Sequence, residues 1–138
     1  MVQNGPRNLV ALVCPHAGYL YSGSVAAHAY FKLAEDGKPD VIVLLGPNHT
    51  GRGSVLSIVN QGAWRTPLGD IEIDARVANQ ILDETSVTEA DDTAHAYEHS
   101  IELQLPFLQY LFDSSFKIVP ICLTKSSEKV NIIICPVL

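Results

Sequence analysis

The chain has 138 residues, of which 47% are hydrophobic and 17% charged, whereas about 25% of an ordinary soluble chain is charged. This composition excludes a disordered chain, and the length suits one domain. Nine basic residues against fifteen acidic ones give a net charge of -6. Because no basic run is present, we expect neither nucleic acid nor an anionic membrane surface as a partner.

The apolar segments are short. The longest, residues 41–45 and 132–138, fall far below the ~20 residues that a bilayer requires, and residues 1–8 lack the pattern of a signal peptide. We therefore expect a cytoplasmic protein. Cys14, Cys122 and Cys135 form neither an even disulfide set nor a C-x-x-C pair, so we expect buried thiols, with a lone metal-ligating cysteine as the alternative.

The first third of the chain alternates between strand and helix patterns. Residues 9–14 (LVALVC) and 40–45 (DVIVLL) are apolar runs typical of strands covered on both faces. Between them, Ser22 or Ser24 can cap a helix that ends near Ala34. Strand, helix and strand predict a βαβ unit whose strands are parallel neighbours or near neighbours. The helix is expected to bury Val25, Ala29 and Leu33 and to stop at Gly37.

The later segments continue the alternation. Asp74 is expected to cap a helix that reaches about Leu82, and Pro106 should kink or break a helix over residues 100–112. We expect strands at 54–59, 117–122 and 129–138, an antiparallel hairpin at 63–73 and a loop at 85–96.

The predicted fold is an α/β domain in three layers, with a mostly parallel central sheet, flanking helices and an antiparallel hairpin. We expect residues 1–138 to form one domain or part of one. The apolar strand at 129–138 ends without a cap, turn or polar tail, so it is either an interior strand or a point of truncation.

Two histidines follow the two predicted βαβ strands. His16 lies in a CPHAGY loop after the first strand and His49 in a GPNHTG loop after the second. Carboxyl ends of parallel strands form the ligand crevice of such sheets, so the two imidazoles can converge. Neutral imidazole suits zinc, copper and iron, and we favour metal ligation by both residues. The alternative is that each histidine only hydrogen-bonds its own loop.

A third histidine stands at the expected start of the helix over 100–112. Ser100 can cap this helix, and Glu98 suits its positive N-terminus. His99 would then face a polar crevice as a proton donor or acceptor, or as an orienting group. His28 and His95 are expected to be non-catalytic.

Four ordered motifs resemble the Memo-like family, which includes the B component of the AmmeMemoRadiSam group and is similar in fold to the class III extradiol dioxygenases. They are PHAGYLYSG at 15–23, LGPNHTG at 45–51, WRTPLG at 64–69 and EHSIELQLPFL at 98–108. Family members are much longer than this chain, so its C-terminal half is expected to be missing. After Thr124 the sequence departs from the family pattern.

The resemblance implies a pocket in which His16 and His49 hold the metal, iron(II) or copper, with zinc as a substitute. It also implies that His99 lies near this pocket and that Tyr19 and Tyr21 line it. We add Asn48 to the cleft, and Glu98 joins His99 as a catalytic residue. The third ligand of the family, a cysteine or a glutamate, would come from the missing half, and we do not assign it to Cys122 or Cys135.

Three functions remain open on sequence alone. The first is a metal-dependent, dioxygenase-like oxidoreductase acting on a small molecule. The second is a non-catalytic module that binds a peptide or small ligand in the same cleft, with contacts at Tyr19, Tyr21, Trp64 and Arg65. The third is an incomplete domain whose exposed sheet is covered by a partner or by a second copy of the chain, as a homo-oligomer.

Overall fold

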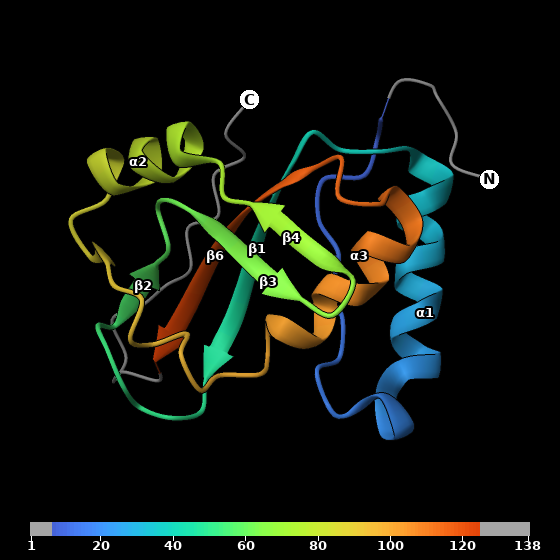
Figure 1. Cartoon of the computed structure of the whole chain (residues 1–138), viewed down its shortest axis with the longest axis horizontal. Helices are drawn as coiled ribbons and strands as arrows, with labels where there is room; N and C mark the ends of the chain where they lie inside the picture. Colours follow the sequence, from blue (N-terminus) through green and yellow to red (C-terminus); the bar gives the residue numbers. More distant parts are fainter. Residues whose placement is uncertain (1–6, 125–138) are drawn as a thin grey trace.

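A four-stranded mixed sheet forms the centre of the molecule. The structure, a computed structural model, describes residues 7–124. The strand order is β1, β6, β2, β5, in which β1 pairs with β6 and β2 with β5 in parallel, while β6 and β2 are antiparallel (Figure 1). The α/β fold class is confirmed. The strands are β1 (Val41–Asn48), β2 (Leu56–Ile58), β5 (Thr88–Ala90) and β6 (Lys117–Thr124), with a separate antiparallel hairpin of β3 (Ala63–Thr66) and β4 (Gly69–Glu72).

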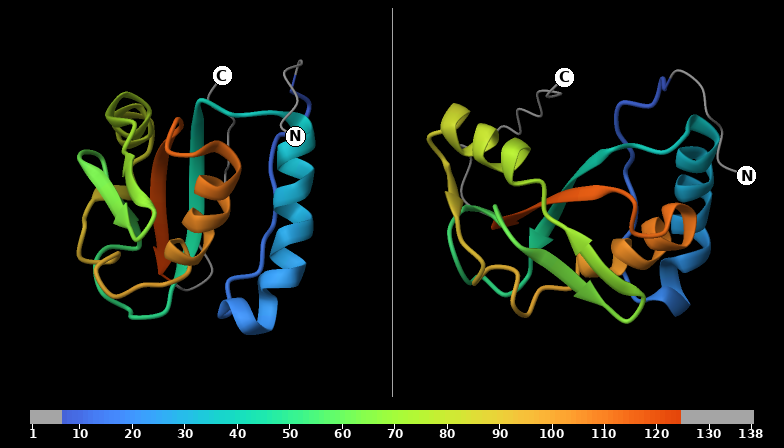
Figure 2. Two further views of the ribbon diagram at one scale, coloured as in Figure 1. Left: turned by 45° about the vertical axis from the view of Figure 1, so that its right-hand side comes forward. Right: turned by 45° about the horizontal axis from the view of Figure 1, so that its top comes forward.

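Helices cover both faces of this sheet. Successive residues of a strand point to opposite faces, and those of β6 do so here. Ile118 packs with helices α1 (Tyr19–Asp36) and α3 (Leu105–Phe112), whereas Val119 packs with α2 (Ala75–Glu84). Figure 2 shows the sheet between these helices, which gives the three predicted layers. Among the described residues, no helix combines the length and the apolar character needed to cross a bilayer.

The segment 9–14 does not form the predicted strand. It runs extended beside α1 (Figure 2) and is anchored at its start, where the backbone N–H groups of Asn8 and Leu9 donate to the Asp36 carboxylate at 2.8 and 3.0 Å. Side chains on one side of it, Leu9, Leu12 and Cys14, pack against the main core, but Val13 is 96% exposed. The parallel neighbour of β1 is β6, not this segment, so the predicted βαβ pairing is wrong within residues 7–124.

Helix α1 differs from its prediction in its start and its inner face. It begins at Tyr19 after Gly18, and the hydroxyl of Ser22 lies inside the helix, where it donates to the Ala17 carbonyl oxygen at 2.8 Å. Val25, expected inside, is 61% exposed. The buried residues are instead Ser22, Ala26, Tyr30, Leu33 and Ala34. The predicted stop at Gly37 is confirmed, since this residue has a φ of 107° and donates its N–H to the Leu33 carbonyl at 3.1 Å.

Other boundaries are partly as predicted. The Asp74 carboxylate caps α2 by accepting the Val77 N–H at 2.9 Å, as expected. The predicted loop over 85–96 contains β5 instead of being wholly irregular. The predicted helix over 100–112 breaks into a 3₁₀ turn, η1 (Glu102–Gln104), followed by α3 with Pro106 in its first turn. Pro106 lacks an N–H group, which costs nothing at a helix start. The strand expected at 129–138 and Cys135 lie outside the described residues.

Candidate metal centre

Three histidines converge beside the carboxyl end of β1. His49 follows this strand directly, His16 lies in the loop before α1, and His99 lies in the loop before η1. The ring centroids of His16 and His49 are 5.2 Å apart, those of His49 and His99 4.8 Å, and those of His16 and His99 6.2 Å. The structure therefore brings His16 and His49 together even though residues 9–14 form no strand.

The loop that carries His16 is held from α1 and η1. Gln104 Nε2 donates to the Pro15 carbonyl oxygen at 3.3 Å, and the Tyr30 hydroxyl donates to Gln104 Oε1 at 2.6 Å. On the other side of His16, the Ala17 carbonyl accepts from Ser22. These contacts come from distant parts of the sequence, which explains why pairing between strands is not needed to place the His16 ring.

Glu98 is a buried carboxylate beneath two of the imidazoles. Its side chain is 1% exposed, and it accepts hydrogen bonds from His49 Nδ1 at 2.8 Å and from the backbone N–H groups of His49, His99 and Ser100. Burial by itself would raise the pKa of Glu98, but the hydrogen bonds from His49, Ser100 and His99 outweigh it and lower the pKa to about 2. Glu98 is therefore ionised at neutral pH and cannot act there as a proton donor.

The same contact defines the tautomer of His49. A carboxylate can only accept hydrogen bonds, so His49 Nδ1 must carry the proton that Glu98 receives. In the neutral ring, Nε2 then has a free lone pair. The side chains of His49 and His99 are 46% and 52% exposed, so both rings are accessible to a ligand.

Asn48 and Gly46 shape the loop that carries His49. Asn48 Oδ1 accepts the backbone N–H groups of Thr50 and Gly51 at 3.0 and 3.1 Å, and Nδ2 donates to the Arg52 carbonyl at 2.6 Å. Nδ2 also donates to the Thr124 hydroxyl on β6 at 3.0 Å, so the Asn48 amide is used by its own loop and by the sheet, and a contact with a ligand stays a prediction. A Cβ atom at Gly46 would lie only 2.5 Å from Ser100 Oγ, so the absence of a side chain lets β1 approach the His99 loop closely.

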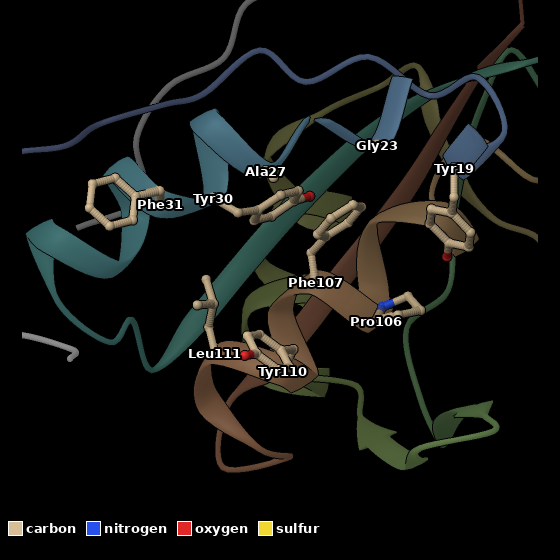
Figure 3. A pocket seen from close by; sticks show the side chains of 9 residues that line it. All are labelled: Tyr19, Gly23, Ala27, Tyr30, Phe31, Pro106, Phe107, Tyr110 and Leu111. Carbon is tan, nitrogen blue, oxygen red and sulfur yellow. The ribbon is translucent and has the colours of Figure 1, made fainter. Parts of the chain in front are cut away.

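The predicted cleft tyrosines lie on α1, outside the histidine cluster. Tyr19 lines an aromatic groove between α1 and α3, where its ring meets Phe107 edge-on with centroids 5.8 Å apart (Figure 3). Tyr21 is 82% exposed. Arg65, the predicted contact in the hairpin, forms an exposed ion pair with Asp70 at 2.9 Å. A role of these residues in ligand binding stays a prediction.

His95 has a set of buried contacts that the sequence did not predict. Its Nε2 lies 3.0 Å from the Ser57 carbonyl oxygen, its Nδ1 lies 3.4 Å from Cys122 Sγ, and the Trp64 ring meets it edge-on. These contacts join the loop that carries His95 to β2, β3 and β6. Burial raises the pKa of the Cys122 thiol to about 12, so this cysteine is protonated and matches the prediction of a buried thiol.

Comparison with known proteins identifies the relatives of this arrangement. The model of a protein family described as Memo-like protein matches residues 2–138. The chain belongs to the Memo-like family. It is 53% identical over 129 residues to a MEMO1 family protein of Sulfurisphaera tokodaii, which covers 94% of this chain. It is also 52% identical to one of Saccharolobus solfataricus over 90% of this chain and 55% identical to one of Methanopyrus kandleri over 87%.

The matches extend over less than half of each relative. This chain spans 45% of the Sulfurisphaera protein, 44% of the Saccharolobus protein and 42% of the Methanopyrus protein. The comparisons confirm the family that the four motifs predicted, and they confirm that members of this family are longer than this chain. The histidine cluster of this Memo-like chain lies entirely within the matched part.

Proposed function

We propose that this Memo-like chain carries the metal-binding half of a metal-dependent oxidoreductase, with His16 and His49 as ligands. The observation that carries the proposal is the convergence of their imidazoles, with ring centroids 5.2 Å apart, beside the end of β1. The donor set fits iron(II) or copper, with zinc as a substitute, because neutral imidazole binds all three. A cytoplasmic location is part of this proposal.

The residues around the two ligands have distinct contributions. Glu98 holds His49 with Nδ1 protonated, which leaves Nε2 to face a metal. A bound metal would supply a Lewis acid and a one-electron redox centre. His99 lies next to His49 and is half exposed, so a free His99 ring could exchange a proton with a substrate bound beside the histidine cluster. The substrate proposed is a small molecule.

The donor set can be tested by metal analysis. The freshly purified chain, its His16→Ala/His49→Ala double variant and a His28→Ala control should be compared by elemental analysis, because His28 is an exposed residue of α1 away from the cluster. We expect metal in the parent and control and a large loss in the double variant. Equal metal content in all three would contradict ligation.

The alternative function is a binding module for a peptide or small ligand. The observation that favours it is the aromatic groove between α1 and α3, in which Tyr30 and Phe107 stack with centroids 4.9 Å apart (Figure 3). Aromatic side chains are frequent binding anchors. If the double variant keeps the metal content of the parent, this alternative becomes the better account.

A further inference from the structure

We propose that His99 is a third metal ligand, so that this chain by itself builds a three-imidazole site from His16, His49 and His99, with Glu98 outside the coordination sphere as a positioning residue. This inference rests on the proposed function of His16 and His49, and it replaces the proton-exchange role given there to a free His99 ring. It differs from what the resemblance implies, since there the third ligand comes from a part of the family domain that this chain does not match.

Two of the three ring separations suit ligands of one ion, and the third is longer. Imidazoles that bind one zinc-sized ion at about 2.0–2.1 Å through nitrogen, at tetrahedral or octahedral angles, have centroids about 4.5–5.2 Å apart. The His16–His49 separation of 5.2 Å and the His49–His99 separation of 4.8 Å lie in this range. The His16–His99 separation of 6.2 Å exceeds it by about 1 Å. A small closure of the two loops would bring all three pairs into range.

One ring must also turn. The rings of His49 and His99 are stacked, with planes inclined by only 23°, so their in-plane lone pairs do not yet point at a common centre. Rotation of a histidine ring about its Cβ–Cγ bond is soft. His99 is 52% exposed, and its Nδ1 lies 3.3 Å from Glu98 Oε1, a much longer contact than the 2.8 Å between His49 Nδ1 and the same oxygen. His99 is therefore the ring that can reorient on binding.

Glu98 is a poor ligand despite its place beside both rings. The possible ligand atoms of His49, Glu98 and His99 lie within 4.8 Å of one another, which by distance alone would allow a carboxylate ligand. However, the side chain of Glu98 is 1% exposed, and its oxygens already accept from His49 Nδ1 and three backbone N–H groups. A metal that approaches from solvent would contact the exposed imidazoles of His49 and His99 before this buried carboxylate. Glu98 instead orients His49, as carboxylates commonly do for metal-bound histidines.

The test is a cobalt(II) titration of the full chain after treatment with a chelator. Cobalt(II) reports both affinity and the number of ligands through its visible absorption. Single variants His16→Ala, His49→Ala and His99→Ala are compared with His28→Ala as the control. We expect each of the first three to weaken cobalt binding by at least about tenfold and to change the spectrum, since even changes outside the coordination sphere cost about 10- to 100-fold. The control should match the parent.

The outcomes separate this inference from the proposed function. If His99→Ala binds cobalt with the affinity and spectrum of the parent while His16→Ala and His49→Ala do not, the third-ligand proposal is wrong and the proposed function stands. If His49 and His99 matter but His16 does not, both the three-imidazole site and the His16 ligand of the proposed function are wrong. If none of the three variants differs from the parent, both proposals fail. Far-ultraviolet circular dichroism of each variant excludes loss of fold as the cause.

The positioning role of Glu98 needs a separate readout. In Glu98→Gln the neutral amide can no longer impose a proton on His49 Nδ1, so we expect nitrogen NMR to show a mixture of His49 tautomers and cobalt affinity to fall by about 10- to 100-fold. Glu102→Gln changes an exposed carboxylate on η1 and serves as the control. An unchanged His49 tautomer in Glu98→Gln would overturn the positioning role.

Discussion

The Tyr30 hydroxyl donates a 2.6 Å hydrogen bond to Gln104 Oε1 and so joins α1 to η1 behind the loop that carries His16. Gln104 uses its Nε2 for the Pro15 and Ser100 carbonyl oxygens, one next to His16 and one next to His99. The buried Gln104 amide therefore connects the His16 loop and the His99 loop with α1.

Tyr30→Phe should destabilise the protein. Gln104 Oε1 would lose its donor in a buried environment, and an unsatisfied buried acceptor costs about 1–3 kcal/mol. The free energy of unfolding in urea measures this loss. Tyr110→Phe is a matched control, because Tyr110 lies on α3 and is 87% exposed. Equal stability of the two variants would contradict the role assigned to the Tyr30 hydroxyl.

Gly46→Ala should disturb both stability and metal binding. The new Cβ atom would lie 2.5 Å from Ser100 Oγ and 2.7 Å from Ile101 Cγ1, so the loop after His99 must move. Overpacking of this kind typically costs about 1–3 kcal/mol. Because the Ser100 N–H donates to Glu98, the shift should reach the carboxylate that holds His49.

Thermal unfolding and cobalt(II) titration of Gly46→Ala check this expectation. Gly23→Ala is the control, since a Cβ atom there lies 3.7 Å from the nearest side-chain atom, an ordinary contact, within α1. Alanine is favoured over glycine inside a helix, so the control should be as stable as the parent or more stable. If Gly46→Ala has the melting temperature of the parent, the loop after His99 moves without a loss of stability, which would contradict the prediction.

Local sequence signals predicted the parts of the fold that depend on neighbouring residues. The Asp74 cap, the stop at Gly37 and the hairpin with Pro67 and Gly69 follow from local backbone chemistry, and the structure has all three. The segment 9–14 was mispredicted because an apolar run indicates burial but not pairing. Its side chains partly pack on the core, whereas its pairing depends on distant strands.

In the candidate site, too, features that depend on distant contacts could not be predicted from local sequence signals. The convergence of His16 and His49 was predicted from their positions after two parallel strands, and it holds although residues 9–14 form no strand. The sequence could not show that Glu98 is buried beneath His49 and His99, because this depends on how the 98–102 turn docks against the end of β1. The only signal available was an acidic residue directly before His99. Likewise, nothing local marks Gln104 as the link between the His16 loop and α1.

Self-association is expected through the uncovered part of β1. Within residues 7–124 this strand pairs only with β6, and Val43 and Leu45, on the face that α2 covers elsewhere, are 41% and 39% exposed. Unprotected apolar edges of sheets tend to pair with another chain. We expect sedimentation velocity to show a concentration-dependent dimer or larger species that Leu45→Lys weakens. Val25→Lys, at an exposed site on α1, should associate like the parent, and a parent that stays monomeric would contradict the prediction.

His95 should make stability fall in mild acid. Burial lowers the pKa of His95 below its ordinary value of 6.5, although the Ser57 carbonyl and the carboxylates of Asp92, Asp91 and Glu98 act in the opposite direction. At a pH between the pKa of His95 in the folded protein and its higher pKa in the unfolded chain, the unfolded chain binds more protons than the folded protein. Stability contributed by neutral His95 is therefore fully present above pH 6.5 and is lost as the pH falls from there through the folded pKa.

The buried contacts of His95 give the reason and the variant. Cys122 keeps its proton and can donate it to Nδ1 while Nε2–H donates to the Ser57 carbonyl, so a second ring proton would face a thiol that accepts weakly. In His95→Gln this titration is absent. We expect urea unfolding, with a chelator present, to show a smaller loss of stability between about pH 7.5 and about pH 5.5 in His95→Gln than in the parent. His28→Gln, at an exposed site, should keep the dependence of the parent, and an equal loss in His95→Gln would show that other groups cause it.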